Sequence, residues 1–357
     1  MDSITQAALG ATVAGAIAGK HCNAKVLLMG AALGTLPDLD VILDYGDAVQ
    51  NTIKHRGFTH SLLVLPPFAL LISWLYCRWR PDSFWTLSRV FFLTVSVFVT
   101  HTLLDAMTTY GTQLIWPFEG YFELRNVFII DPLYTLPLLL AIGVALFSKS
   151  RGGRWCQSVV LISTLYLGWG YVSQQMVASR VEQNLAAQNL PNQQVLITPT
   201  PFNTFLWRVV VMDDGQYYEG LASVLDSDQR INFVTYPLGS WPMADKPDTL
   251  KGLKAFSHDY LNYRVEDDAL IVTDLRLGMS NNLSFEFIFA EKGEDGQWHL
   301  LESTQRYPSE RSLDLLGQLW ERLKGDQSID ANLQRMELSA RSQFTCMRSP
   351  TRSCLAL

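Results

Sequence analysis

Charged residues are scarce in the first half of this 357-residue sequence. Residues 1–177 contain 11 Lys and Arg and 10 Asp and Glu, whereas residues 178–357 contain 17 and 24. The first half is too apolar for a water-soluble domain, and the second half has an ordinary soluble composition. Such a composition excludes a disordered or collagen-like chain. The second half is also net negative and would repel phosphate backbones, so we expect no nucleic-acid partner.

Cysteine is rare as well, with five in the chain. Three lie beside apolar runs of the first half, where we expect reduced thiols: Cys22, Cys77 and Cys156. Cys346 and Cys354 lie near the end of the sequence and are either two unpaired thiols or a pair across a short loop. A basic N-terminal segment with a Leu-rich core is missing too, so we expect no cleaved secretory signal peptide.

Uncharged apolar runs recur along the first half and predict six helices. The last four are about 17 to 21 residues long, enough to cross a hydrocarbon layer of roughly 30 Å. The first two are short and rich in Gly and Ala, which suits close packing inside a bundle. The runs are 4–19, 26–36, 61–77, 90–107, 127–147 and 156–176.

Lys and Arg gather in the short loops on one side of this series of helices. Such a bias marks the cytoplasmic side of a membrane. The other side then holds the loops 37–60 and 108–126 and everything after residue 177. We therefore predict a multi-pass protein of the bacterial inner membrane whose second half is periplasmic. The residues behind this prediction are Lys20, Lys25, Arg78, Arg80, Arg89, Lys149, Arg151 and Arg154.

The second half predicts a small α+β domain. Strand-like runs separated by turn residues predict three hairpins, at 205–225, 263–277 and 284–302. Amphipathic patterns at about 247–258 and 309–324 predict two helices that cover one face of the sheet.

Together the two halves predict a membrane-spanning all-α bundle of about six helices followed by a soluble α+β domain. We place the bundle at 1–177, the outer domain at 178–345 and a tail at 346–357. The outer domain has no metal-ligand spacing, and His258 and His299 are interpreted as surface or helix-cap residues.

Ionisable residues, which are costly at the ends of membrane helices, gather in three clusters. Two carboxylates close the second helix, two imidazoles and a guanidinium open the third around Gly57, and a His and an Asp one turn apart end the fourth. By the Lys and Arg bias, all three ends lie on the outer side and should converge. The residues are Asp38 and Asp40; His55, Arg56 and His60; and His101 and Asp105.

Imidazole with carboxylate is the ligand set of zinc and also suits manganese or iron, and a cluster of this size can hold two ions. Each element alone has a simpler reading: an Asx-bonded helix end at Asp38, a His101–Asp105 hydrogen bond, or an Arg56 that snorkels to the interface. Taken jointly, they favour a metal site. We place Arg125 and Asp131 near the site, and we interpret Asp44, Asp47, Glu119 and Glu123 as solvated loop charges.

The combined motif resembles the YdjM-like family of LexA-regulated, membrane-bound proteins described as metal-dependent hydrolases. The matching segments over about residues 1–175 are MDSITQAALGA, LPDLD, HRGFTHS, HTLLDAMTTYGTQLIWPF and NVFIIDPLYTLPLL. The His–Asp pattern is more distantly similar to the zinc-dependent phospholipase C and single-strand nuclease group. The resemblance implies that the metal ligands are Asp38, His60, His101 and Asp105, with Asp40 and His55 next.

One position departs from the family pattern. Many relatives have a Thr-His pair where this sequence has Thr5 and Gln6. The resemblance then implies that the site holds fewer ions or uses Gln6 for hydrogen bonding.

We therefore predict a metal-dependent hydrolase that acts on a phosphoester or lipid-linked substrate at the outer face of the inner membrane. In this hypothesis Asp40 or His55 orients a ligand or takes a proton from water, and Arg56 binds an anionic group bidentately. The alternative is a non-enzymatic membrane protein with a structural metal or His–Asp cluster and a partner-binding periplasmic domain. An open coordination position would separate the two.

Overall fold

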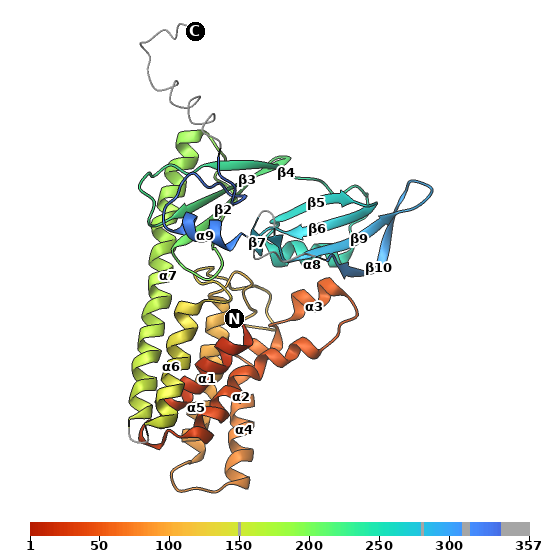
Figure 1. Cartoon of the computed structure of the whole chain (residues 1–357). Coiled ribbons are helices and arrows are strands. Elements are labelled where there is room, and N and C mark those ends of the chain that lie inside the picture. The colour runs from red at the N-terminus through yellow and green to blue at the C-terminus, as the bar shows by residue number, and fades with distance from the viewer. Residues whose placement is uncertain (149–150, 280–281, 309–314, 337–357) are drawn as a thin grey trace.

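The computed structural model describes residues 1–148, 151–279, 282–308 and 315–336. A helical region is followed by a region of antiparallel sheets that lies beyond one end of the helices (Figure 1). The two regions are joined by α7 (Gly152–Gln188), a helix of 37 residues that packs beside the bundle and continues into the sheet region. The predicted tail, with Cys346 and Cys354, lies outside the described residues.

Six helices of the helical region coincide with the six apolar runs. Three of them have a side-chain N-cap: Asp2, Asn23 and Asp131 accept hydrogen bonds from backbone N–H groups of the first turn. α4 starts four residues later than its run, with Pro66 and Pro67 in its first turn, where proline is tolerated. The bounds are α1 (Ser3–Ala18), α2 (Ala24–Thr35), α4 (Leu65–Trp79), α5 (Leu87–Ala106), α6 (Pro132–Phe147) and α7.

Among the described residues, α5 is the one helix that is long and apolar enough to cross a membrane unaided. A second span results if Ala48–His60 and α4, which meet at a bend of 60°, count as one broken span. α2 and α6 are apolar but shorter. The prediction of six membrane-spanning helices therefore stays a prediction, although the six helices themselves are present.

α1 and α2 pack so closely that glycine is required at their contact. A Cβ atom on Gly34 would lie 2.5 Å from the backbone oxygen of Gln6, and one on Gly10 would collide with the backbone of Gly30. The Gly- and Ala-rich runs thus form a close helix pair, as predicted. This contact brings Gln6 beside the end of α2, where the candidate site begins.

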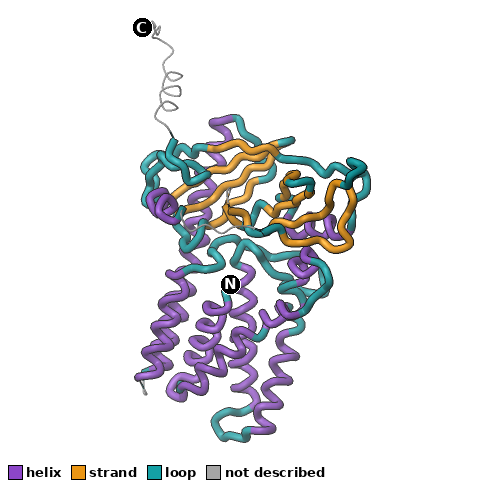
Figure 2. The backbone as a smooth tube through the Cα atoms, turned by 45° about the vertical axis from the view of Figure 1, so that its right-hand side comes forward, coloured by secondary structure: helices purple, strands orange, loops and turns teal. Residues whose placement is uncertain are grey.

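The sheet region contains two four-stranded antiparallel sheets, drawn in orange in Figure 2. The predicted hairpins are present as β2–β3, β5–β6 and β9–β10. The first sheet has the order β1 (Val195–Pro199), β2 (Leu206–Asp213), β3 (Gln216–Ser223), β4 (Phe233–Pro237). The second has the order β10 (Trp298–Arg306), β9 (Glu286–Lys292), β6 (Ala269–Asp274), β5 (Leu261–Glu266), and β7 (Gly278–Met279) pairs with β8 (Asn282–Leu283).

The two predicted amphipathic patterns form helices in part. α8 (Asp248–Ser257) lies within the first pattern and buries Leu250, Leu253 and Phe256. α9 (Leu316–Leu323) covers the end of the second pattern, of which residues 309–314 lie outside the described residues. His258 ends α8 in a left-handed conformation, so its interpretation as a helix-cap residue is confirmed.

Parts of the helical half complete the core of the sheet region. α3 (Ala48–Lys54) and Tyr110 contribute to the apolar cluster that contains Phe256 and Phe287, and α7 contributes Val181 to the cluster under the first sheet. The loop before α3 is also hydrogen bonded to β10, since Asp47 accepts from the backbone N–H of Thr304 at 2.7 Å. The loop between α2 and α4 is therefore held from above by the sheet region.

Candidate metal centre

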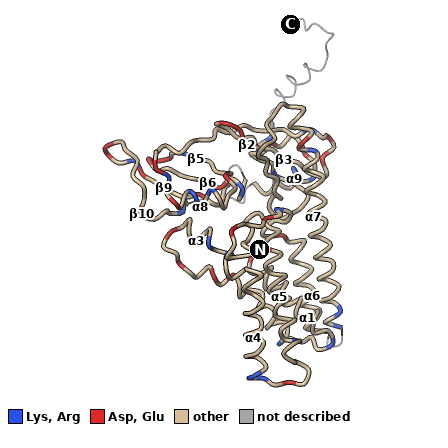
Figure 3. The backbone as a smooth tube through the Cα atoms, turned by 180° about the vertical axis from the view of Figure 1, so that it is seen from behind, with Lys and Arg blue, Asp and Glu red and all other residues tan. Residues whose placement is uncertain are grey.

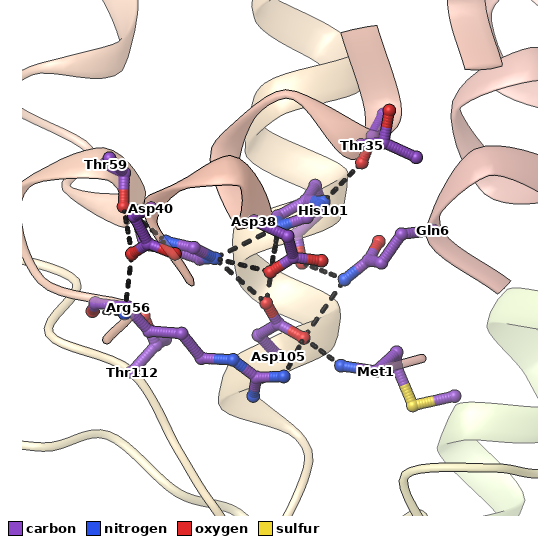
Figure 4. Close-up of polar contacts among 12 residues, drawn as sticks. Met1, Gln6, Thr35, Asp38, Asp40, Arg56, Thr59, His101, Asp105 and Thr112 are labelled. Atoms are coloured by element: carbon purple, nitrogen blue, oxygen red, sulfur yellow. Dashed lines mark hydrogen bonds and ion pairs between the residues drawn. The ribbon is translucent and has the colours of Figure 1, made fainter. Parts of the chain in front are cut away.

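Four side chains from three elements meet at the end of the helical region that faces the sheets (Figure 4). Each offers one potential ligand atom, and these four atoms lie within 4.8 Å of one another. They are the four residues predicted as ligands: Asp38 of the short 3₁₀-helix Pro37–Ile42, His60 at the end of the 3₁₀-helix Phe58–His60, and His101 and Asp105 of α5.

The spacing of these atoms fits a single ion. His60 Nε2 and His101 Nε2 are 3.1 Å apart. Asp105 Oδ2 lies 3.2 and 3.3 Å from these two nitrogens, and Asp38 Oδ1 lies 3.3 and 3.6 Å from them. Tetrahedral ligands at about 2.0–2.1 Å from a zinc ion are about 3.3–3.4 Å apart.

The Nδ1 atoms of His60 and His101 both have hydrogen-bond partners in the protein. His101 Nδ1 donates to the backbone oxygen of Gly34 at 2.7 Å, because a carbonyl only accepts. The Thr59 hydroxyl donates to Asp40 Oδ2 at 2.7 Å and so accepts from His60 Nδ1 at 2.9 Å. With Nδ1 bonded in this way, each ring in its neutral form would present the lone pair of Nε2 to the same point, as metal-binding histidines do.

The two carboxylates show the same need for a cation. Asp38 Oδ1 and Asp105 Oδ2 are buried and accept no hydrogen bond among the described residues. Burial disfavours the charged form of Asp38, yet the imidazoles of His101 and His60 hold the pKa of that carboxyl well below its ordinary value. Two carboxylate oxygens thus face two imidazole nitrogens, and a divalent cation bound between them would satisfy all four.

The second oxygen of Asp105 is fully engaged with the protein. Asp105 Oδ1 accepts from the amino group of Met1 and from Gln6 Nε2 at 3.0 Å, and Gln6 Nε2 also lies 3.3 Å from the backbone oxygen of His101. Gln6 therefore orients Asp105 by hydrogen bonding, which is one of the two roles that the family pattern left open.

Asp40 holds the loop that carries His60. It accepts from His55 Nδ1 at 2.7 Å, from the backbone N–H of Arg56 at 2.9 Å and from Thr59. Burial opposes ionisation of Asp40, but the hydrogen bond and charge of His55 and the Thr59 hydroxyl lower its pKa below the ordinary value. The side chain of His55 is 22% exposed.

Arg56 lies beside the ligands and is 3% exposed. Its Nη2 is 3.3 Å from Asp105 Oδ1, its Nη1 donates to Thr108 Oγ1 at 3.4 Å, and its guanidinium lies 4.9 Å from the centre of the Tyr110 ring. Arg56 Nε is buried with no hydrogen-bond partner among the described residues. This nitrogen is a donor with unused capacity beside the candidate metal position.

The turn between the two imidazoles contains two unusual backbone conformations. Gly57, around which we expected the turn, has φ −88° and ψ −114°, and Arg56 before it is left-handed, with φ 62°. The hydrogen bond from the Arg56 N–H to Asp40 fixes this conformation.

The interpretation as solvated loop charges is wrong for two of the four residues. Glu123 is 3% exposed at its side chain and pairs with Arg276 at 2.6 Å and Arg125 at 2.9 Å. Asp47 caps α3 and bonds to β10, as described above. Both anchor the helical region to the sheet region or to its own loops.

Asp131, which we expected near the site, instead caps α6 and accepts from the Tyr166 hydroxyl at 2.7 Å. Arg125, expected there as well, pairs with Glu123. Sequence reasoning missed Thr59 and Thr108, whose hydroxyls support His60 and Arg56. The HRGFTHS segment contains Thr59, and its position between two histidines was the available signal.

Comparisons with known proteins give consistent results. Residues 1–177 match the family described as YdjM inner membrane protein. The chain is 35% identical to inner membrane protein YbcI of Escherichia coli (strain K12) over 144 residues, which cover 38% of this chain and 81% of that protein. It is 22% identical to the uncharacterized protein YfhP of Bacillus subtilis (strain 168) over 244 residues, which cover 65% of this chain and 72% of that protein. No solved structure gives a significant match.

Proposed function

We propose that this chain, which belongs to the YdjM family of inner membrane proteins, is a membrane-bound hydrolase that uses one divalent metal ion to cleave an anionic ester. The observation that carries the proposal is the convergence of two imidazole nitrogens and two carboxylate oxygens at the spacing of ligands around one ion, beside a buried guanidinium. Zinc suits these ligands best, and manganese or iron suits them next.

Each residue has a role that follows from its contacts. Asp38, His60, His101 and Asp105 would hold the ion, which when bound would lower the pKa of a water toward about 7. Arg56 would bind the anionic group of the substrate through its unused Nε and its terminal nitrogens.

The Asp40–His55 pair would handle the proton. Asp40 fixes the His55 ring through Nδ1, which leaves Nε2 to take a proton from water and return it to the leaving group. Asp40 also holds the Arg56 backbone, so one carboxylate positions both groups.

The membrane arrangement is part of the proposal. Large apolar side chains are exposed over the helical region, whereas only six in the described part of the chain after residue 177 are exposed. Lys and Arg gather at the end of the helices remote from the sheets, as Figure 3 shows in blue. Six helices in the inner membrane, with residues 178–345 in the periplasm, would account for both patterns.

This arrangement places the site at the outer surface of the membrane, at the level of lipid headgroups. A phosphoester of a membrane lipid, or of a lipid-linked molecule, is then the substrate class that the site would meet there. The periplasmic position of the sheet region follows from the same argument.

One observation favours a second candidate function. Four protein ligands can fill a tetrahedral site, and closed tetrahedral sites are typical of structural metals. In that case the metal would stabilise the junction of the two regions and the sheet region would bind a partner. Asp38, which is 15% exposed, marks the side from which water would reach the ion in a catalytic site.

The test is metal analysis of the full-length protein purified in detergent, run beside assays with phosphomonoester, phosphodiester and phospholipid substrates. We expect about one metal ion per chain and hydrolysis that is lost with a chelator and restored by zinc, manganese or iron. His101→Ala should lower bound metal at least about tenfold, because a ligand is lost.

His299→Ala is the matched control, since His299 is exposed and pairs only with Asp295 among the described residues. Metal without hydrolysis of any ester would favour the structural alternative. Equal metal content in wild type and His101→Ala would overturn the metal centre itself.

A further inference from the structure

A cavity of about 510 Å³ lies between the ends of the helices and the sheet region. From the helical region it is lined by Phe128, Ile129 and Ile130, which precede α6. From the sheet region it is lined by residues that include Phe202, Met279 and Phe285. Its volume is in the range of about 300–1,000 Å³ that is usual for ligand sites, and its lining is predominantly apolar.

The cavity shares a wall with the candidate metal centre. Thr108 and Tyr110 line the cavity, and they are also the residues that contact the Arg56 guanidinium. Thr108 follows directly from α5, since its hydroxyl donates to the backbone oxygen of Asp105 at 2.8 Å. The side chains of Thr108 and Tyr110 therefore lie between the apolar cavity and the Arg56 guanidinium, which would receive an anionic group.

Exposed apolar residues lie at the cavity wall and at the start of α6. Ile129 is 37% exposed, Ile130 is 47% exposed, and Leu133 in the first turn of α6 is 50% exposed. Such side chains are costly in water when they gather and normal against lipid. In the proposed orientation this end of α6 lies where the headgroup layer meets the hydrocarbon.

The polar groups of the cavity do not suit a peptide. Arg276, the charged side chain of its sheet wall, is already bonded to Asp274 at 2.7 Å and to Glu123. A peptide would bring backbone N–H and C=O groups that need partners when they are buried. A hydrocarbon chain brings none, so it is the occupant that this lining accepts without loss of hydrogen bonds.

We propose that this cavity binds a hydrocarbon chain of the lipid substrate, whose anionic ester is then held at Arg56 and the metal centre. The inference rests on the proposed function and adds to it the substrate class: an ester that carries a long apolar chain. Both ends of the substrate would determine specificity, because Arg56 would select its negative charge and the cavity would select the length of its hydrocarbon chain.

The test uses the full-length protein in vesicles of phosphatidylethanolamine and phosphatidylglycerol. A fraction of the phosphatidylglycerol carries a photoreactive diazirine at the end of one acyl chain, and mass spectrometry locates the labelled residues. Ile129→Trp and Met279→Trp fill the cavity from opposite walls, and Ile162→Trp on the exposed face of α7 is the control.

We expect label on the cavity residues of wild type and of Ile162→Trp, and at least about a tenfold loss in both cavity variants, because a filled cavity excludes the chain. Unchanged metal content in the variants shows that the site has folded. Label that is equally weak in wild type and in the cavity variants would overturn the proposal. A variant that lacks residues 337–357 is labelled in parallel. Label that reaches the cavity only in this variant would also overturn the proposal, since residues 337–357 would then be the occupant.

This experiment does not depend on hydrolysis, so it separates the two proposals. Labelling without hydrolysis would leave the cavity as a lipid site and contradict the enzyme. If the enzyme is correct, Ile129→Trp should raise KM for a phospholipid ester at least about tenfold, whereas the control Ile162→Trp should leave that KM unchanged.

Discussion

The helical region and the sheet region bury their apolar residues in opposite ways. The helical region packs small residues at its centre, such as Gly10 and Gly34, and leaves large side chains such as Phe92 and Leu140 outside. The sheet region buries large side chains such as Trp207 and keeps a polar surface. The first pattern suits lipid and the second suits water.

The candidate site lies where these two patterns meet. Its ligands come from the helical region, whereas the loop that carries His60 is held from above by the sheet region. The comparison indicates that the helical region provides the candidate ligands, whereas the sheet region holds the loop between α2 and α4 in place. The predictions below test that division.

Arg276→Met is expected to have the largest effect, because it breaks the ionic link between the regions. Arg276 is 1% exposed and donates to Asp274 and Glu123. Its loss leaves Asp274 buried without a cation, which costs about 3–5 kcal/mol of the free energy of unfolding. Unfolding in detergent, followed by tryptophan fluorescence, measures it.

The matched control is Arg264→Met, which removes a part-exposed pair with Glu286 and should cost about 1 kcal/mol or less. Equally small losses in both variants would show that the two regions do not depend on each other.

Arg56→Lys is expected to lower the hydrolytic rate by about 10²–10³, roughly 2.7–4 kcal/mol in the barrier, because lysine keeps the charge but loses the fork that binds an anion. Bound metal should not change, since a cation is not a ligand. kcat/KM and metal content are measured on the same preparation.

A fully active Arg56→Lys protein would show that the guanidinium fork does not bind the anionic group of the substrate. A variant that loses metal as well would show that Arg56 holds the loop rather than the substrate.

Val49→Ala sharpens the comparison, because Val49 belongs to the helical half but is fully buried in the core of the sheet region. Two lost methyl groups at about 0.8 kcal/mol each, with a small cavity term, should cost about 2 kcal/mol. Metal affinity, measured by competition with a chelator, should fall less than in His101→Ala. Val265→Ala, at a position 58% exposed, should change neither quantity.

Asp47→Ala is expected to have the smallest effect, about 1 kcal/mol, since it removes the cap of α3. The Thr304 N–H loses its acceptor at the same time, so hydrogen exchange at Thr304 should accelerate. Asp44→Ala, in the same loop, should leave that exchange rate unchanged. Equal exchange rates in both variants would place the anchor of the loop elsewhere.

The sequence was sufficient for the helices and for the convergence of the three ionisable clusters, and the family resemblance implied which four residues are the ligands. The apolar runs are local signals, and local signals determine where a helix lies. The Lys and Arg bias then placed the ends of α2 and α5 on one side, so that Asp38 and His101 could be expected to converge.

The sequence could not show what depends on contacts between distant segments. Nothing in the local sequence distinguishes Glu123 and Asp47 from solvated acids. Tertiary packing buries Glu123 against Arg276, and Asp47 caps α3. The left-handed conformation of Arg56 likewise accompanies a hydrogen bond to Asp40, sixteen residues earlier in the chain.

The hydrogen bond from Thr304 to Asp47 joins residues that are 257 positions apart in the chain. A ribosome adds about 5–20 residues per second, so roughly 13–50 s pass between the synthesis of the loop and that of the strand that holds it. During this interval the helices can pack and α8 can already contact α3, but the loop with Asp40, His55 and Arg56 still lacks the hydrogen bond from β10. The four candidate ligands are therefore synthesised long before the last anchor of the loop that carries His60.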